Sequence, residues 1–340
     1  MTRSIPTGTR NILPEEMREL RSIESTLAGL FDDRGYGEVA TPAIEHLEAA
    51  EAGAARLGSP AYRFFDESGA SLALRSDMTV PIARLVATRY RNQEGPFRFR
   101  YSDRIFRPVQ PQRGEMRELH QVGIELIGAE APGGTIEVVE LLVGALDAIG
   151  LERAVIGLGD ADLFRQLLDE LEVEGPARDR ILSCLEAHDL VAIEAEAGDL
   201  AGIGDAERRA IVELSNLRGG ADVLTRARAI GGQAVERAGS RLAETFDGLE
   251  AAGIADRVQL DLGLLRDLGY YTGAILEVYD PAMGSVLGGG GRYDTLLDGF
   301  GRMMPAAGFA LYLDRLHIAQ AAQRARTDPP REAAGEGEAP

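Results

Sequence analysis

Residues 97–127 read FRFRYSDRIFRPVQPQRGEMRELHQVGIELI, and this stretch decides the fold. Phe97, Phe99 and Tyr101 alternate with polar residues, a period of two that is typical of a half-buried strand. The apolar run at 122–127 predicts a returning strand, and turn-forming residues lie between the two. The stretch therefore predicts an antiparallel pair of strands joined by a long, basic loop.

The flanking sequence predicts helices before and after this pair and further strands near the end of the chain. Apolar residues three and four apart predict helices at 14–33, 135–149 and 310–322, and a mostly helical, acidic segment at 160–255. Strands are expected at 258–262 and 270–279, and the four glycines at 288–291 are interpreted as a turn of close backbone approach rather than a phosphate cradle. The order of elements predicts an α+β fold, an antiparallel sheet flanked by helices with a helical insertion.

The composition excludes several kinds of chemistry. The chain has 340 residues and a net charge of −19, and all 36 basic residues are arginine. Without lysine there is no Walker A phosphate loop and no Schiff base. One cysteine excludes an internal disulfide, and four widely spaced histidines predict no metal site. We expect no cofactor. We also expect no membrane association and a cytoplasmic location, because no run approaches about 20 apolar residues.

Ten arginines lie between residues 75 and 117, against four acidic residues. Three explanations fit this basic patch: it binds nucleic acid, it binds an anionic metabolite, or it neutralises the acidic remainder of the chain. The third is favoured, because the interleaved aromatic residues are also what a half-buried strand requires.

Two acidic residues stand out. Glu125 lies inside the apolar strand, where a carboxylate is costly unless it is paired. A salt bridge to an arginine of the basic patch is the favoured interpretation, and a ligand ammonium group is the alternative. Asp77 and Thr79 precede Pro81 in an arrangement suited to a helix N-terminus, so capping competes with any ligand role.

Along residues 5–320 the chain resembles the catalytic core of class II histidyl-tRNA synthetases. The resemblance is carried by Leu74-Arg75-Ser76-Asp77-Met78-Thr79, by Phe106-Arg107, the loop 111–114 and His120-Gln121-Val122-Gly123-Ile124-Glu125, by Arg266-Asp267-Leu268-Gly269-Tyr270-Tyr271, by Gly290-Gly291-Arg292-Tyr293-Asp294, and by Gly308-Phe309-Ala310 through Asp314-Arg315-Leu316. It implies a class II core at 1–325 with its insertion at about 160–255, a disordered acidic tail at 326–340 and no anticodon-binding domain. Pro42 stands at the family's dimer-interface proline, so a homodimer is implied.

The resemblance also implies a histidine-binding site at the matching positions: Asp77, Thr79, Arg107, Gln121, Glu125, Arg266, Tyr270 and Tyr271. Asp77 and Glu125 suit an ammonium group. Arg266, with Arg107, suits a carboxylate, and Tyr271 or Gln121 suits imidazole nitrogens through neutral hydrogen bonds.

Three departures from the family pattern affect ATP. Val109 replaces a glutamate that holds the adenine amino group, Glu115 replaces an arginine that pairs with the terminal phosphate, and Tyr312 replaces a glycine that leaves room for adenine. A reversed charge facing a triphosphate is repulsive. These positions therefore indicate a degraded ATP site.

The pattern is similar to the synthetase-like paralogues that regulate the short-form ATP phosphoribosyltransferase. The resemblance implies a non-catalytic subunit that assembles with the separate catalytic subunit, responds to L-histidine as effector and binds no tRNA. Two alternatives remain: an active ligase that activates histidine, and a structural dimer with a relict pocket.

Overall fold

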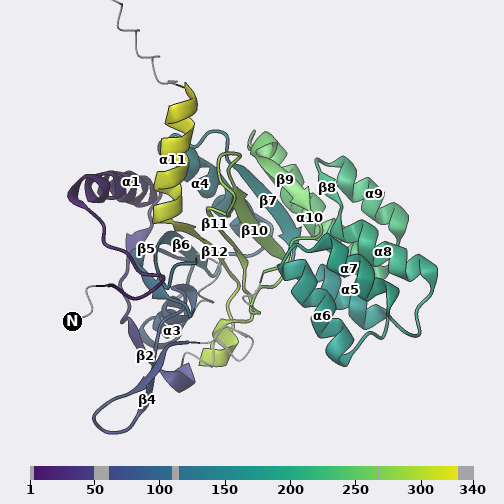
Figure 1. Ribbon diagram of the computed structural model, residues 1–340, viewed down its shortest axis with the longest axis horizontal. Coiled ribbons are helices and arrows are strands. Elements are labelled where there is room, and N and C mark those ends of the chain that lie inside the picture. Colours follow the sequence, from purple (N-terminus) through teal and green to yellow (C-terminus); the bar gives the residue numbers. More distant parts are fainter. Residues whose placement is uncertain (1–3, 50–60, 109–114, 267–268, 328–340) are drawn as a thin grey trace, which may run out of the picture.

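A mixed nine-stranded sheet forms the centre of the molecule (Figure 1). The computed structural model describes residues 4–49, 61–108, 115–266 and 269–327. In order across the sheet the strands are β1 Gly37–Glu38, β5 Phe97–Phe106, β6 Glu118–Ile127, β12 Ala306–Tyr312, β11 Gly288–Arg292, β10 Ala274–Tyr279, β7 Val155–Asp160, β9 Val258–Asp261 and β8 Arg218–Gly219. Neighbours are antiparallel except β1 with β5 and β7 with β9. This sheet and its flanking helices confirm the α+β prediction.

Strands β5 and β6 form the predicted antiparallel pair, with Phe97 opposite Ile127 and Phe106 opposite Glu118. The alternation works as expected, because the odd-numbered residues 97, 99 and 101 of β5 are buried in one core while the even-numbered ones face the other side of the sheet. Most of the predicted loop between the strands, at 109–114, lies outside the described residues.

Helices cover both faces of the sheet. One face carries α1 Pro14–Asp33, α4 Gly133–Ala148, α11 Leu313–Thr327 and α10 Gln233–Ala251, which pack on β6, β12 and β7 (Figure 1). The other face carries α3 Thr79–Arg89 and the 3-10 turn η3 Leu297–Phe300, which close a smaller core with the aromatic residues of β5. Helix α1 has the bounds that its apolar spacing predicts. None of the helices in the described part of the chain is long and apolar enough to cross a membrane.

Along the chain, the helical segment comes between β7 and β9, which are parallel neighbours in the sheet. In space it lies at one end of the sheet (Figure 1). Its helices are α5 Leu163–Glu170, α6 Gly175–Glu186, α7 Leu190–Gly198, α8 Asp205–Ser215, α9 Asp222–Ile230 and α10, followed by the 3-10 turn η2 Ala255–Arg257. Buried residues of these helices, such as Ile181, Ile193 and Leu214, continue the larger core. We call residues 163–251 the helical insertion.

A separate small sheet extends from the other side of the molecule (Figure 1). Its strands are β2 Ile44–His46, β4 Ser71–Leu74 and β3 Arg63–Phe65, all antiparallel, with β4 in the middle. Strand β4 leads directly into Asp77 and α3, so this sheet positions one wall of the site described below.

The glycine run is a central strand and not the expected turn. Gly288–Arg292 form β11, hydrogen-bonded to β10 on one side and β12 on the other. The sequence did indicate close approach correctly, because a Cβ at Gly290 would lie 2.0 Å from the Gly308 carbonyl oxygen. Glycine here serves packing against neighbouring strands and side chains, which turn propensity alone does not reveal.

The last helix begins later than its periodicity predicts. Strand β12 continues through Tyr312, and α11 starts at Leu313, whereas the sequence predicted a helix from Ala310. The buried pairing of Ala310 with Gly123 and Gly289 outweighs the helical pattern. The predicted acidic tail beyond 327 lies outside the described residues.

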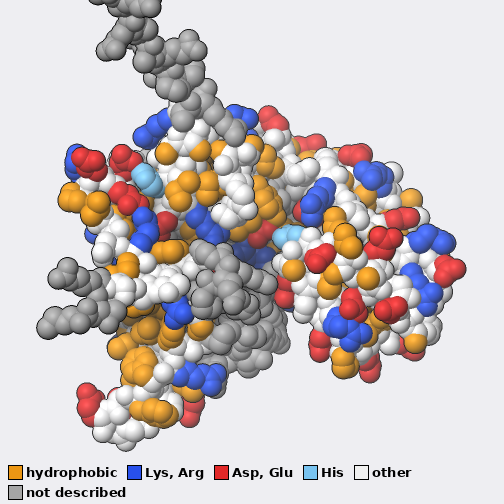
Figure 2. Space-filling model, viewed as in Figure 1, with side chains coloured by type: hydrophobic (Ala, Val, Ile, Leu, Met, Phe, Trp, Pro, Cys, Tyr) orange, Lys and Arg blue, Asp and Glu red, His pale blue; other side chains and the backbone are white. Residues whose placement is uncertain are grey.

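Five of the ten arginines of the basic patch form ion pairs with carboxylates in the described part of the chain: Arg75, Arg84, Arg98, Arg100 and Arg104. We call the face of the sheet that carries α1, α4, α10 and α11 the helix-covered face. There Arg98 bonds Glu137 of α4 and Arg100 bonds Asp32 of α1, each with an Nε to oxygen distance of 2.7 Å. This supports the favoured explanation of the arginines as partners of the acidic chain. Over the helical insertion, arginine and acidic side chains are interspersed on the face drawn in Figure 2.

Candidate ligand-binding site

One pocket brings together seven of the eight residues predicted to bind histidine: Asp77, Thr79, Arg107, Gln121, Arg266, Tyr270 and Tyr271. They come from α3, β5 and β6 and from the segment before β10, and glycines of β11 and β12 form the floor. The cavity volume is about 20 Å³, and the wider empty space between the side chains, which includes open solvent, is about 390 Å³. The eighth residue, Glu125, lies just beneath it, in contact with Thr79.

Glu125 is 1% exposed and has no arginine partner among its hydrogen bonds in the described chain. Its carboxylate accepts a hydrogen bond from Thr79 Oγ1 at 2.7 Å and another from the Tyr293 hydroxyl. Burial raises the pKa of Glu125 to about 8. The favoured sequence interpretation, a salt bridge, is therefore wrong, because Arg98 and Arg100 point to the opposite face and Arg107 bonds Ser76 and Tyr312.

Glycine makes room for this carboxyl group. A Cβ at Gly308 would lie 2.1 Å from Glu125 Oε2, and one at Gly123 would lie 2.6 Å from the Tyr101 hydroxyl. Side chains at these two positions would displace Glu125 or the tyrosine beside it. The strands therefore preserve an acidic group under the pocket rather than fill the space with apolar atoms.

Asp77 supplies a second carboxylate. It is 5% exposed, and Oδ1 accepts from the Val80 N–H at 2.8 Å, so it caps α3 as the sequence suggests. Burial raises the pKa of Asp77, and the Val80 bond and the charge of Arg107 act against that rise. Capping and ligand roles are compatible, because Asp77 also lines the pocket.

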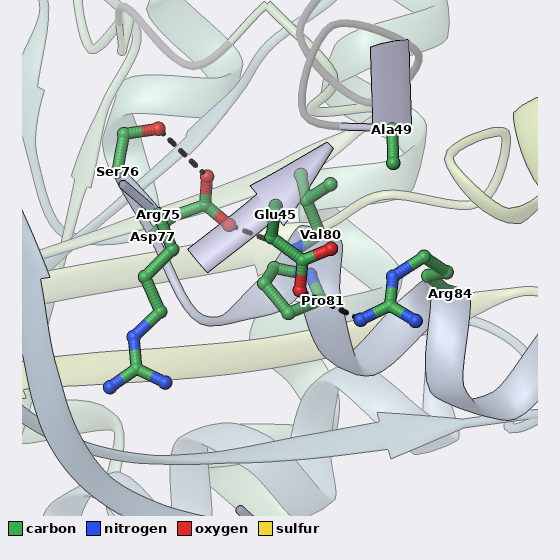
Figure 3. Close-up of a pocket in the computed structure, with 8 residues that line it drawn as sticks. All are labelled: Glu45, Ala49, Arg75, Ser76, Asp77, Val80, Pro81 and Arg84. Atoms are coloured by element: carbon green, nitrogen blue, oxygen red, sulfur yellow. Dashed lines mark hydrogen bonds and ion pairs between the residues drawn. The ribbon is translucent and has the colours of Figure 1, made fainter. Parts of the chain in front are cut away.

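A smaller hollow of about 290 Å³ lies on the other side of Asp77 (Figure 3). Its charged groups are engaged with each other or with the backbone: Arg84 bonds Glu45 at 2.7 Å, and Arg75 Nη1 bonds the Thr41 carbonyl at 2.6 Å. Asp77 turns toward Ser76 and the start of α3 in this view. We therefore place the candidate site on the Gln121 side of Asp77, where the charges are less completely paired.

Two arginines also line the pocket. Arg107 lies close enough to Asp77 for its charge to act on that carboxyl. It donates from Nε to the Ser76 carbonyl at 2.9 Å and from Nη1 to the Tyr312 hydroxyl at 3.2 Å, neither of which is an ionised carboxylate. Arg266 Nη1 lies 3.4 Å from Glu277 Oε1, a long contact, and Arg266 Nε is buried with no hydrogen-bond partner among the described residues. Two guanidinium groups therefore retain donors for an anion.

Tyr312 fills the space between these arginines. Its hydroxyl meets Arg107, and the centre of its ring lies 4.4 Å from the Arg315 guanidinium carbon. Burial acts to raise the pKa of Tyr312, but the charges of Arg107, Arg266 and Arg315 outweigh it, so the pKa is lowered. A phenol thus occupies a position that attracts negative charge.

The pocket also offers neutral polar groups. Gln121 is 4% exposed, and its Oε1 has no hydrogen-bond partner. Tyr270 and Tyr271 lie with ring centres 4.9 Å apart, and Tyr270 meets the edge of Tyr293 at 6.0 Å. A buried acceptor without a donor is rare in folded proteins. A ligand can supply the missing donor.

The other members of the degraded ATP site are less informative. Val109 lies outside the described residues, as do Asp267 and Leu268 of the matched motif. Glu115 is exposed and is not among the described residues that line the pocket. Of the two described members, Tyr312 is in the pocket wall.

The sequence did not single out three functional features. Tyr293 holds Glu125, Gly289 and Gly308 provide clearance for pocket side chains, and Glu277 contacts Arg266. The glycine–arginine–tyrosine motif at 290–293 was the one available signal for Tyr293. Glu277 carries the same signal as Glu125, a carboxylate inside an apolar strand, but the sequence alone gave no reason to connect it with Arg266.

The pocket therefore combines carboxyl groups, two guanidinium groups and neutral polar groups. A zwitterion carries an ammonium and a carboxylate a few ångströms apart, and a third, polar group would meet the neutral groups. This arrangement fits a polar amino acid.

Comparisons with known proteins identify the family of the chain. The family model described as Histidyl-tRNA synthetase matches residues 8–316. The ATP phosphoribosyltransferase regulatory subunit of Moorella thermoacetica is 42% identical over 323 residues, 93% of this chain and 82% of that protein. The chain belongs to the histidyl-tRNA synthetase-like family of ATP phosphoribosyltransferase regulatory subunits.

Other members of the regulatory-subunit family support the assignment. The subunit of Symbiobacterium thermophilum is 40% identical over 329 residues, 96% of this chain and 82% of that protein. A crystal structure from Bacillus halodurans C, described as an ATP phosphoribosyltransferase regulatory subunit/histidyl-tRNA synthetase, has a TM-score of 0.85 and 30% identity, covering 94% of this chain and 84% of that one. The predicted class II fold and the role of regulatory subunit rather than enzyme are confirmed.

Proposed function

We propose that this regulatory subunit senses L-histidine in the pocket and conveys feedback to the catalytic subunit of ATP phosphoribosyltransferase. The observation that carries the proposal is a pocket that combines the carboxyl groups of Asp77 and of Glu125 beneath it with the guanidinium groups of Arg107 and Arg266. The names of the relatives support the enzyme and the subunit class. The pocket supports the chemistry of the effector.

In the proposed complex, the α-ammonium group of histidine meets Glu125 and Asp77. Its carboxylate meets Arg266, assisted by Arg107, as a charge-assisted hydrogen bond. The imidazole meets Gln121 or Tyr271, which supply neutral partners. The unfilled Gln121 acceptor suits an imidazole N–H.

Histidine activation with ATP is not part of this proposal. Tyr312 places a hydroxyl beside Arg107, where a nucleotide phosphate would otherwise need that arginine, and Glu115 adds negative charge to the loop region. We therefore propose neither aminoacylation nor tRNA binding.

The proposed partners are a second copy of this chain, forming a homodimer, and the short-form catalytic subunit. Regulation requires that histidine bind one state of the complex more tightly than another, because a ligand with equal affinity for both states shifts nothing. A difference of ten- to a hundredfold between the states would be ordinary for allosteric coupling.

Calorimetry with chemically trimmed ligands tests the pocket. L-Histidine should bind, whereas L-histidinol, which lacks the carboxylate, and imidazolepropionate, which lacks the ammonium, should bind at least tenfold more weakly. Equal binding of all three would contradict the proposed contacts of both charged groups.

Reconstitution tests the regulatory role. The short-form catalytic subunit should need this chain for full activity, and L-histidine should inhibit the complex. Arg266→Gln should preserve assembly and weaken inhibition, with Arg98→Gln, on the other face of the sheet, as matched control. The same activity and inhibition with and without this chain would refute the proposal.

A further inference from the structure

Glu277 on β10 is a carboxylate that is 7% exposed and contacts two regions of the molecule. Its Oε1 lies 3.4 Å from Nη1 of Arg266 in the ligand pocket. Its Oε2 lies 3.4 Å from Nε2 of His188 and accepts a hydrogen bond from the Tyr279 hydroxyl. One buried acid is therefore shared between the pocket and a histidine of the helical insertion.

His188 lies in the turn between α6 and α7 and reaches out of the insertion to make this contact. Its φ is 52°, the left-handed region, and its N–H bonds the Leu185 carbonyl at 3.0 Å, closing the end of α6. Glycine is the usual residue at such a helix end, because a side chain is disfavoured there. At this position the side chain contributes the contact of the insertion with Glu277.

Arg266 is held loosely on its side of Glu277. Nη1 is 3.3 Å from the Leu276 carbonyl and 3.4 Å from Glu277, and Nε has no partner. The guanidinium lies across Gly289, where a Cβ would be 1.8 Å from Nη1. A carboxylate bound from the pocket side would compete with Glu277 for this guanidinium group.

We propose that Glu277 and His188 are positioning residues that connect occupancy of the pocket to the helical insertion. An anionic group that engages Arg266 weakens its pairing with Glu277, and Glu277 then pairs more strongly with His188 and holds the α6–α7 turn against β10. The inference rests on the proposed function, in which the carboxylate of histidine is that anionic group. The insertion, which adjoins the sheet at β7 and β9 (Figure 1), is then the part of the subunit that responds to the ligand.

The surroundings of His188 make the exchange measurable. The bond to Glu277 raises the pKa of His188, burial opposes that rise, and the charges of Asp261 and Arg218 act in opposite directions. Asp261 and Arg218 are themselves paired at 2.9 Å, on β9 and β8. When Glu277 loses Arg266, the pKa of His188 should rise further, and by reciprocity protonation of His188 should tighten ligand binding.

The experiment is NMR titration of the imidazoles in full-length protein with isotopically labelled histidine residues and unlabelled L-histidine as ligand. The chain has four histidines, so His188→Gln assigns the signal. Saturating L-histidine should raise the pKa of His188 by about 0.5 or more, which corresponds to about threefold tighter binding by the protonated form. His317, 3.2 Å from Glu19 between α11 and α1, is a matched histidine–glutamate pair away from the pocket, and its NMR signals should stay unchanged when the ligand binds.

Two variants separate this inference from the proposed function. Arg266→Gln should raise the pKa of His188 with no ligand present, and Glu277→Gln should lower it and abolish any response to the ligand. In calorimetry, His188→Gln should weaken L-histidine binding about threefold at pH 6 and hardly at pH 8.5, whereas His317→Gln should leave it unchanged at both.

The outcomes are distinguishable. If wild-type protein shows no heat with L-histidine, the proposed function fails, and the Arg266→Gln titration alone decides whether Glu277 is shared. A His188 pKa that is unchanged by Arg266→Gln overturns the inference, and so does an unchanged pKa when L-histidine binds. If L-histidine changes the NMR signals of His188 and His317 together, the change is global, and this outcome also overturns the inference.

Discussion

The two faces of the β5–β6 pair carry charged residues in opposite circumstances. On the helix-covered face, Arg98 meets Glu137 and Arg100 meets Asp32, so each arginine has a carboxylate partner. On the pocket face, Glu125 is held by hydroxyl groups and Arg107 by a carbonyl and a phenol. The same two strands therefore separate charges that hold helices in place from charges that remain available to a ligand.

The difference shows why the arginine patch is a poor guide to function on its own. Ion pairs that are one-third exposed, such as Arg98 with Glu137, contribute little free energy but fix the position of a helix. A buried carboxyl without a cation costs stability, and such a cost is a common property of binding sites. Removal of a charge should therefore affect mainly ligand affinity on the pocket face and mainly stability on the helix-covered face.

The largest effect is expected from Glu125→Gln. The variant keeps the shape of the side chain, but its amide NH2 turns one of the two hydroxyls, Thr79 or Tyr293, from donor to acceptor. It also cannot form the carboxylate that would meet the ammonium group, which Glu125 forms by losing its proton when the ligand binds, since its pKa is about 8. Calorimetry should show at least a 100-fold loss of L-histidine affinity, on the order of 2.7 kcal/mol. Glu137→Gln, a carboxylate on the other face, should bind L-histidine like the wild type. Equal losses in the two variants would contradict the distinction between the faces.

The next effect is on stability. The pKa of Glu125 is about 8 in the folded protein, above its ordinary value of 4.5, so between these pH values the folded state holds a proton that the unfolded state has lost. Stability contributed by this group is present below pH 4.5 and is lost as the pH rises through 8. The free energy of unfolding should therefore fall by a few kcal/mol more in wild type than in Glu125→Gln from pH 5 to pH 8.5, measured by urea unfolding. Parallel curves for the two proteins would show that the carboxyl is not buried as described.

The sequence predicted much of this arrangement where the signal is local. The alternation of Phe97, Phe99 and Tyr101 gave a strand with two distinct faces, because side-chain direction along a strand follows from backbone geometry. The seven residues that meet in one pocket were implied by the resemblance to histidyl-tRNA synthetases and by no local pattern.

What the sequence did not predict depends on distant parts of the chain. Tyr293 reaches Glu125 from 168 residues away, so the partner of that carboxyl could not be inferred from its strand. The glycines of β11 have the composition of a turn, and only the positions of β12 and Arg266 show that side chains do not fit there. Likewise, the contact of Glu277 with His188 requires the insertion to be placed against β10.

A smaller effect is expected where the pocket meets its lost nucleotide site. Wild type should show no histidine-dependent pyrophosphate exchange with ATP. The combined change Tyr312→Gly, Glu115→Arg and Val109→Glu should remove the phenol beside Arg107, reverse one charge and restore an acceptor for adenine, so ATP should bind at least tenfold more tightly, measured by calorimetry. Arg98→Gln, added to the triple variant, should leave this gain unchanged. No gain in ATP binding would mean that these three residues do not account for the loss.

The smallest effect is expected on the helix-covered face. Arg98→Gln removes a two-pronged bond to Glu137, with Nε and Nη2 at 2.7 and 2.8 Å, and leaves Glu137 with the Tyr36 hydroxyl as partner. Both side chains are about one-third exposed, so solvent and salt screen the pair, and the loss should be about 0.5–1 kcal/mol in urea unfolding. The loss of stability should be smaller in 1 M salt, because the screening length there, about 3 Å, is comparable with the separation of these exposed charges. L-Histidine affinity should stay within twofold of wild type, because the guanidinium lies on the opposite side of the sheet from Glu125. A larger loss of affinity than of stability would mean that the two faces are coupled through β5, and the separation of structural from binding charges would then have to be abandoned.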